Sequence, residues 1–212
     1  MTTLTQLIGS SALGYERFLD LAVRIIEKVA AFHDNAVVLG TISADTIFVE
    51  HDNQIIVADP ESTQVGRANV QPYLSPEQLS GKEPEPRSDL FALGVLFYQM
   101  LTGKVPFEGE TNKAQLASIT REHAEGIFLS RVDIPSEARL VISKLLEPEP
   151  SDRFSSSHEL LATLKAIQAD KYSKVEVREA DSKRHSPRTY LVLAGITVAI
   201  VVFWWLVAAF KK

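Results

Sequence analysis

Two neighbouring stretches decide the fold of this chain: LSPEQL at residues 74–79 and SDLFALGVLFYQMLTGKVPF at residues 88–107. A helix from Asp89 to Leu101 would be apolar on nearly every side, which predicts a helix buried inside a domain. The first stretch places a Ser-Pro-Glu sequence shortly before that helix. The rest of the chain is therefore expected to pack around this central helix.

Length and composition bound the possibilities. The chain has 212 residues, of which 45% are hydrophobic, enough for one domain of ordinary size with additional segments. The 27 acidic and 22 basic side chains are dispersed and give a net charge of -5, so we expect no nucleic-acid partner. The absence of cysteine excludes disulfides, thiolate catalysis and cysteine metal sites.

The spacing of apolar residues predicts a mainly α fold with one small β-hairpin. Residues 4–8 are expected to form a short helix, and a long amphipathic helix is expected from Tyr15 to about His33. Two β-type runs, 46–50 and 54–58, are separated by a short polar turn and predict a hairpin. Three more helices are predicted over residues 114–124, 135–146 and 157–169.

The C-terminal part of the chain has a different composition. Residues 171–189 mix both charges with almost no apolar residues, which predicts a flexible linker between domain and tail. Residues 190–210 contain no charge, and as a helix they would be about 31 Å long, which matches the hydrocarbon core of a bilayer. We expect a transmembrane helix followed by a basic tail, residues 211–212; the alternative is a buried core helix.

The charges beside this segment predict its orientation. An excess of basic residues marks the cytoplasmic side of a membrane helix, so we expect a single-pass, tail-anchored protein with a cytoplasmic N-terminal domain. Gly195 and Ala199 have the small-xxx-small spacing found in some helix dimers, although small residues are common in such helices. Before the segment lie Lys171, Lys174, Arg178, Lys183, Arg184 and Arg188, and after it only Lys211 and Lys212.

Several spaced motifs resemble the large lobe of eukaryotic-type protein kinases, in particular bacterial serine/threonine kinases. Ser75-Pro76-Glu77 is similar to the Ala-Pro-Glu motif that closes the activation segment. Asp89 is similar to the aspartate that begins the central helix and holds the backbone of the catalytic loop. Arg153 resembles the late arginine that pairs with the Pro-Glu carboxylate. The resemblance covers about residues 4–169 and implies a kinase-like large lobe over residues 1–170.

The resemblance also implies structural roles. Glu77 and Arg153 are expected to form a buried ion pair, the alternative being two independent surface charges. Asp89 is expected to hold backbone N–H groups rather than to act as a functional carboxylate. Asp59 stands where the family has Asp-Phe-Gly, and is either a vestigial metal ligand or a turn-forming residue before Pro60.

The catalytic positions depart from the family's pattern. Thr41 stands at the position of the catalytic aspartate, Ser43 at that of the loop lysine and Thr46 at that of the metal-binding asparagine. Phosphoryl transfer depends on positioning and on charge stabilisation, which these hydroxyls do not supply. The family's small lobe, with its glycine-rich loop and strand lysine, has no counterpart in the sequence. We therefore expect a pseudokinase that lacks the small lobe and is not an enzyme, with no cofactor and no bound metal.

The expected function is that of a membrane-anchored, protein-binding scaffold or regulator. A large lobe without its small lobe is expected to expose an apolar surface around Leu39, Ile42 and Ile56, which a protein partner or self-association would cover. One alternative is a nucleotide-binding protein, related to serine/threonine kinases and completed by a partner chain, with Asp59 as metal ligand. Another is a degenerate gene fragment, which predicts poor folding of residues 1–170.

Overall fold

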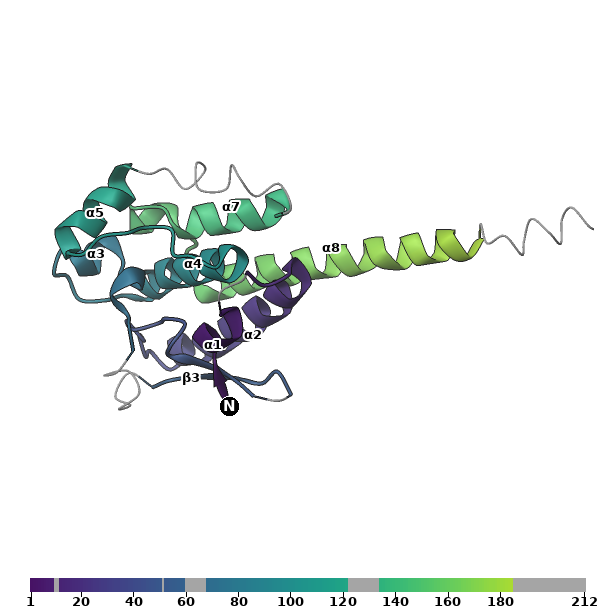
Figure 1. The fold of residues 1–212 in the computed structure, drawn as a ribbon, viewed down its shortest axis with the longest axis horizontal. Coiled ribbons are helices and arrows are strands. Elements are labelled where there is room, and N and C mark those ends of the chain that lie inside the picture. Colours follow the sequence, from purple (N-terminus) through teal and green to yellow (C-terminus); the bar gives the residue numbers. More distant parts are fainter. Residues whose placement is uncertain (10–11, 51, 60–67, 122–133, 185–212) are drawn as a thin grey trace, which may run out of the picture. The chain divides into compact units, whose positions relative to one another are not determined.

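A computed structural model describes residues 1–9, 12–50, 52–59, 68–121 and 134–184 (Figure 1). The chain divides into two compact units, Met1–Gln168 and Ala169–Lys212, and the first contains all the elements discussed below except the end of the last helix. The elements of the described residues are β1 (Thr2–Thr3), α1 (Leu4–Ile8), α2 (Tyr15–Asp34), β2 (Ile47–Val49), β3 (Ile55–Val57), the 3-10 turn η2 (Gln71–Tyr73), α3 (Pro76–Leu79), α4 (Pro86–Thr102), α5 (Asn112–Arg121), α7 (Ser136–Leu145), the 3-10 turn η3 (Pro150–Asp152) and α8 (Ser157–Arg184).

The predicted central helix is α4, and it is buried along almost its whole length. It begins at Pro86 rather than at Asp89, because proline fits the first position of a helix, where no intrahelical N–H bond is needed. The Ser88 hydroxyl also accepts a hydrogen bond from the N–H of Glu85 (3.1 Å), which closes the first turn. The prediction of a buried, all-apolar helix is confirmed, and only its start was placed too late.

Helix α4 packs against α7 on one side and against α2 on the other (Figure 1). Gly94 makes the first contact possible, since a Cβ atom there would lie 2.7 Å from Cβ of Leu145. On the other side the ring of Phe97 meets that of Phe18 edge to face, with centroids 5.7 Å apart. Packing on both sides explains why the helix has no polar face.

Helix α2 is amphipathic, as its spacing predicts. Its apolar residues from Phe18 to Ala30 are buried, whereas Arg24, Glu27 and Lys28 are exposed. Glu27 forms a surface ion pair with Lys165 of α8 (2.8 Å). The predicted helices α1, α2 and α7 are all confirmed to within a residue or two at each end.

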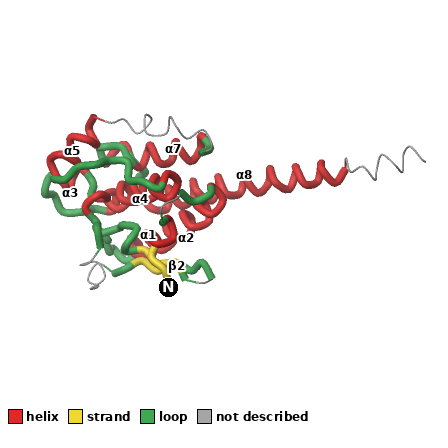
Figure 2. The backbone as a smooth tube through the Cα atoms, in the orientation of Figure 1, coloured by secondary structure: helices red, strands yellow, loops and turns green. Residues whose placement is uncertain are grey.

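The predicted hairpin is formed by β2 and β3, which pair antiparallel with Phe48 opposite Ile56. A third strand, β1, pairs antiparallel with β2 and gives the order β1-β2-β3. The sheet lies at one edge of the helical lobe, beside α1 and α2 (Figure 2). Strand β1 has only two residues, Thr2–Thr3, which is too short for a periodic pattern to reveal.

The segment predicted to be a flexible linker is helical over most of its length. Helix α8 continues through Arg184, so the linker prediction for residues 171–189 is wrong up to that residue. No glycine or proline interrupts the sequence between Ser157 and Ser186, and the alanine, glutamate, lysine and arginine residues there favour helix. Mixed charge alone therefore did not break the helix.

The predicted membrane segment, residues 190–210, lies outside the described residues, as do the tail 211–212 and the end of the predicted linker. Within the described part of the chain, none of the helices combines the length and the apolar composition that a membrane span requires.

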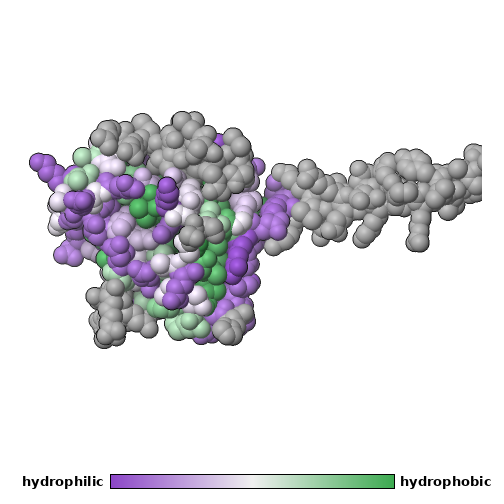
Figure 3. Space-filling model, in the orientation of Figure 1, coloured by the Kyte–Doolittle hydropathy of each residue, from purple (hydrophilic) through white to green (hydrophobic). Residues whose placement is uncertain are grey.

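The expected apolar surface around the loop is not present. Leu39 and Ile42 are buried in the core, with 3% and 1% of their surface exposed, and only Ile56 is open to solvent at 40%. Both buried side chains join the cluster around α2 and α4. On the face drawn in Figure 3, hydrophilic side chains are interspersed with smaller hydrophobic areas. That part of the argument for a covering partner is therefore wrong.

Candidate functional site

The segment at the position of the catalytic loop, residues 39–46, is held in place by a carboxylate of the central helix. Asp89 is fully buried in the first turn of α4. Its Oδ2 accepts a hydrogen bond from the N–H of Leu39 (2.8 Å), and its Oδ1 accepts one from the N–H of Gly40 (2.7 Å). Asp89 thus acts on the backbone, the role that the resemblance implies.

A histidine that the sequence did not single out as a partner completes this contact. His33, in the last turn of α2, places Nε2 3.0 Å from Oδ2 of Asp89. A carboxylate only accepts hydrogen bonds, so Nε2 carries the hydrogen of this pair. The side chain is 8% exposed. Asp89 therefore links the end of α2, the loop and the start of α4.

The backbone of Gly40 explains why no side chain is present at this position of the loop. Its φ of 64° lies in the left-handed region, and a Cβ atom there would lie 3.0 Å from Cγ of Pro84. Its carbonyl accepts a hydrogen bond from Nε2 of Gln78 (2.9 Å). The loop is thereby tied to α3 as well as to α4.

The three hydroxyl residues of the loop are bonded within the loop itself. Thr46 Oγ1 accepts from the N–H of Ser43 (2.8 Å) and lies 3.1 Å from the carbonyl oxygens of Thr41 and Ser43, to either of which it can donate. Thr41 Oγ1 donates to the carbonyl of Leu39 (3.2 Å). Ser43 and Thr46 are almost fully buried. These hydroxyls stabilise the turn that the loop makes.

Asp59 follows β3 and is exposed. The residues directly after it, Pro60 and Glu61, lie outside the description, so the choice between metal ligand and turn residue stays a prediction. Within the described ranges, no three histidine, aspartate or glutamate side chains lie close enough together to hold a metal ion.

Arg153 makes an extensive set of polar contacts inside the lobe. It donates two hydrogen bonds to the carboxylate of Glu77, at 2.8 and 2.9 Å, so that the pair is bidentate. Its other donors reach the carbonyls of Arg87 (2.9 Å), Glu147 (2.8 Å) and Pro148 (2.8 Å). A guanidinium has five N–H groups, and here each one has an acceptor. The residue is 3% exposed.

The carboxylate of Glu77 is stabilised from a second side. The Ser88 hydroxyl donates to Glu77 Oε1 (2.7 Å), and the guanidinium of Arg153 lies 4.9 Å from the ring centre of Phe91. Burial alone would raise the pKa of Glu77, but the hydrogen bonds from Arg153 and Ser88 outweigh it and lower the pKa from 4.5 to about 2. Glu77 is therefore ionised at neutral pH.

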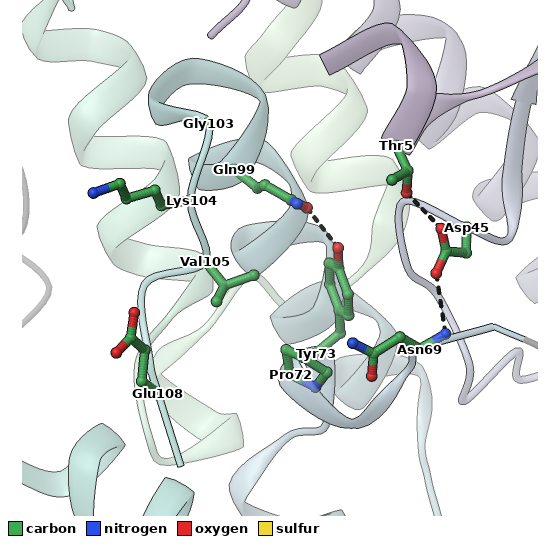
Figure 4. Close-up of a pocket in the computed structure, with 10 residues that line it drawn as sticks. All are labelled: Thr5, Asp45, Asn69, Pro72, Tyr73, Gln99, Gly103, Lys104, Val105 and Glu108. Atoms are coloured by element: carbon green, nitrogen blue, oxygen red, sulfur yellow. Dashed lines mark hydrogen bonds between the residues drawn. The ribbon is translucent and has the colours of Figure 1, made fainter. Parts of the chain in front are cut away.

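A groove lies beside the anchored loop. Its cavity is about 480 Å³, and Figure 4 shows the side chains around it. Asp45, in the loop, accepts from Thr5 Oγ1 (2.6 Å) and from the N–H of Asn69 (3.1 Å). Burial raises the pKa of Tyr73 to about 12, so its phenol remains protonated and donates to Gln99. The groove is lined by Thr5, Asp45, Asn69, Pro72, Tyr73, Gln99, Gly103, Lys104, Val105 and Glu108.

The buried arginine pair, the anchored loop and the mainly helical architecture with its small sheet belong to a protein-kinase-like fold. The protein kinase domain family matches residues 2–164, and the chain belongs to this family. Sequence reasoning missed the contact between His33 and Asp89 and the groove residues other than Asp45, since both depend on contacts between distant segments.

The relatives are serine/threonine kinases. The chain is 30% identical to a probable serine/threonine-protein kinase of Clostridium acetobutylicum, over 78% of this chain and 27% of the relative. It is 27% identical to the serine/threonine-protein kinase PrkC of Bacillus subtilis, over 82% of this chain and 28% of that protein. The chain thus spans little more than a quarter of the length of these relatives.

Solved kinase structures share the fold. The crystal structure of Rad53 1–466 in complex with AMP-PNP superimposes with a TM-score of 0.63, at 24% identity, over 76% of this chain and 43% of that one. At this level of identity the similarity concerns the fold alone.

The prediction that the chain is not an enzyme is contradicted by these relatives. They are named serine/threonine-protein kinases, and the family match extends across the lobe, which points to the kinase class. The prediction was based on three loop positions and on the expectation that the chain has no small lobe. The similarity of the whole lobe outweighs those positions in assigning the class.

Replacing Arg153 by leucine should destabilise the lobe by about 3–5 kcal/mol, because it leaves the Glu77 carboxylate buried without its partner. Urea unfolding of the full chain measures the change. Arg24→Leu is the matched control, since Arg24 forms only an exposed pair with Asp20 and should change stability by at most about 1 kcal/mol. Equal unfolding midpoints for the two variants would show that the buried pair contributes nothing.

The depressed pKa of Glu77 predicts a pH dependence of stability. Its contribution is fully present above pH 4.5, the ordinary value, and is lost as the pH falls toward about 2. The shift corresponds to about 3 kcal/mol. Unfolding free energies of wild type and Glu77→Gln, measured between pH 6 and 2.5, should converge as the pH falls. Parallel curves would contradict the assignment.

Proposed function

We propose that the chain acts as the protein-binding lobe of a serine/threonine-kinase-type signalling protein. The observation that carries the proposal is the groove beside the anchored loop. Its walls come from the loop (Asp45), from η2 (Tyr73) and from the end of α4 with the segment that follows (Gln99, Lys104). The hydrogen bond from Tyr73 to Gln99 links η2 to α4, and Asp45 accepts from Thr5 and from the N–H of Asn69, so the protein itself joins the walls of the groove.

The charges of the groove favour a segment of polypeptide with one basic side chain. Asp45 is half-buried at the groove, and Glu108 is exposed at its edge. Carboxylates of this kind make charge-assisted hydrogen bonds to lysine or arginine. Lys104 lies at the same groove and is exposed, so it disfavours a second positive charge nearby. The proposed partner is therefore a protein, either a binding partner or a substrate, that places a single basic side chain in the groove.

A second candidate is nucleotide binding, completed by a small lobe on another polypeptide segment. It is favoured by the kinase relatives and by the exposed position of Asp59 after β3. This candidate requires magnesium-dependent binding of a nucleotide that Asp59→Ala abolishes. Protein binding and nucleotide binding are compatible within one assembly.

Peptide binding tests the primary proposal. Fluorescence anisotropy of the full chain should show tighter binding of peptides with one lysine than of the same peptides with norleucine. Asp45→Asn should lower the affinity for the lysine peptides by about 10- to 100-fold, because one charge-assisted hydrogen bond is lost. Glu83→Gln, an exposed carboxylate outside the groove, is the control.

Binding that does not depend on lysine or on Asp45 would overturn the assignment of the groove. A parallel titration with a fluorescent ATP analogue and magnesium distinguishes nucleotide binding, the second candidate, from peptide binding. Nucleotide binding lost in Asp59→Ala, with no peptide preference, would favour that candidate instead.

We also propose that residues 190–210 attach the lobe to a membrane, on the strength of their charge-free sequence and the basic residues before them. The full chain should remain with membranes during alkaline carbonate extraction. A chain ending at Thr189 should be released. Equal release of both chains would contradict membrane attachment through this segment.

A further inference from the structure

The last turn of α2 contacts two parts of the lobe through neighbouring residues. His33 places Nε2 3.0 Å from Oδ2 of Asp89, the carboxylate that anchors the loop. The next residue, Asp34, accepts a hydrogen bond on Oδ1 from Nε2 of His158, in the first turn of α8 (2.7 Å). The end of α2 therefore connects the loop anchor to the start of α8.

A second ion pair extends this contact along both helices. Oε1 of Glu27, in α2, lies 2.8 Å from Nζ of Lys165, in α8. The two carboxylates are seven residues apart on α2, and their two partners are seven residues apart on α8, which is about two helical turns in each case. The helices therefore run antiparallel here, with the carboxylates on α2 and the nitrogen groups on α8. We call these two pairs, Glu27–Lys165 and Asp34–His158, the α2–α8 seam.

Apolar contacts, rather than the seam, hold the start of α8 on the lobe. Leu160 and Leu164 are 0% and 1% exposed and belong to the core cluster. The first turns of α8, up to Gln168, lie in the same compact unit as α2. The four side chains of the seam are between 44% and 60% exposed. Exposed ion pairs add little to global stability and are screened by salt, so the seam can open while the lobe stays folded.

The carboxylate of Asp34 is unfavourable for α2 by itself. Asp34 is the last residue of the helix, and the helix dipole disfavours a negative charge at this end. The position therefore favours contact with α8 at the expense of the helix that carries it.

The turn that follows α2 is strained. The N–H of Ala36 donates to the carbonyl of His33 (3.0 Å) and the N–H of Val37 donates to that of Phe32 (3.0 Å), which together form a Schellman motif. Ala36 has a φ of 56°, a conformation that glycine usually adopts at this position of the motif. A residue keeps such a conformation only where its surroundings fix it. The turn leads directly to the loop, so contacts that fix the end of α2 also bear on the loop.

We infer that the α2–α8 seam is a regulatory contact that controls how firmly the loop, residues 39–46, is held. With both pairs formed, the last turn of α2 is fixed from the side of α8, and His33 is held against Asp89. Screening or removal of the seam charges releases this turn and loosens the loop backbone. Asp34 is thus a positioning residue that acts on the loop through His33 and Asp89.

Hydrogen exchange of the full chain, resolved to single amides by NMR, tests the inference. The amides of Leu39 and Gly40 report on the loop, because both donate to Asp89. In Asp34→Ala these two amides should exchange about 3- to 10-fold faster, as expected for the loss of an exposed pair. The amide of Leu93, in the middle of α4, reports on global unfolding and should not change.

The melting temperature separates regulation from a merely structural role. Asp34→Ala removes a charge that opposes the helix dipole, so the melting temperature should stay the same or rise while the loop amides exchange faster. A residue that only supported the fold would lower the melting temperature and accelerate Leu93 together with the loop.

A charge swap tests the other pair of the seam. Glu27→Lys and Lys165→Glu each place like charges opposite one another and should accelerate the two loop amides, whereas the double variant should restore slow exchange. Lys144→Met is the matched control, because it removes an exposed ion pair between α7 and Glu159 of α8 and leaves the seam intact. Raising the salt from about 0.02 M to about 0.5 M should accelerate the loop amides more in wild type than in Asp34→Ala.

The outcomes decide the inference. Selective acceleration of the loop amides that the charge swap reverses, with no effect of Lys144→Met, supports a regulatory seam. Unchanged loop amides in Asp34→Ala and in both single charge variants overturn it. Equal acceleration of Leu93, or a double variant that exchanges as fast as the single ones, overturns it as well.

Discussion

The guanidinium of Arg153 is the contact on which the rest of the lobe depends. It is buried, so its charge is stabilised only because every N–H group has an acceptor, and because one acceptor is the carboxylate of Glu77. The acceptors come from α3, from the start of α4 and from the segment before η3. One side chain therefore fixes three pieces of chain that are far apart in sequence.

The start of α4 connects the contacts of Arg153 to the loop. Ser88 donates to Glu77, and the next residue, Asp89, accepts from the N–H groups of Leu39 and Gly40. The start of α4 thus connects the arginine pair to the loop within two residues. The loop keeps its shape through backbone contacts, although its side chains at Thr41 and Thr46 are uncharged. The backbone geometry of the loop therefore does not require charged side chains at Thr41 and Thr46.

Secondary-structure elements with a clear spacing of apolar residues were predictable from sequence. The buried helix α4, the hairpin and the amphipathic helix α2 follow from apolar spacing. The backbone contacts of Asp89 and the pairing of Arg153 with Glu77 were accessible only through the resemblance, because the groups in contact are 49 to 76 residues apart. Composition misled at residues 171–184, where charge was taken for disorder although nothing in the sequence interrupts a helix.

Other features depend on three-dimensional packing that no local pattern encodes. Leu39 and Ile42 were expected on an exposed face, but both side chains are buried in the core, and the loop backbone beside Leu39 is held by Asp89. The contact of His33 with Asp89 arises because α2 ends beside the start of α4. The assignment to the kinase class also depended on more than a local pattern. The family match covers residues 2–164, whereas the prediction of a non-enzyme was based on three positions of the loop.

The groove and the neighbouring depression form one surface, because Pro72, Val105 and Glu108 belong to both. Their polar groups are in different states. Within the described chain the Tyr73 phenol and the Asp45 carboxylate have partners inside the protein, whereas the buried nitrogen of Gln115 has none. That nitrogen is buried, so the open part of this surface is formed by Pro72 and Val105, which are apolar, and by the exposed carboxylate of Glu108.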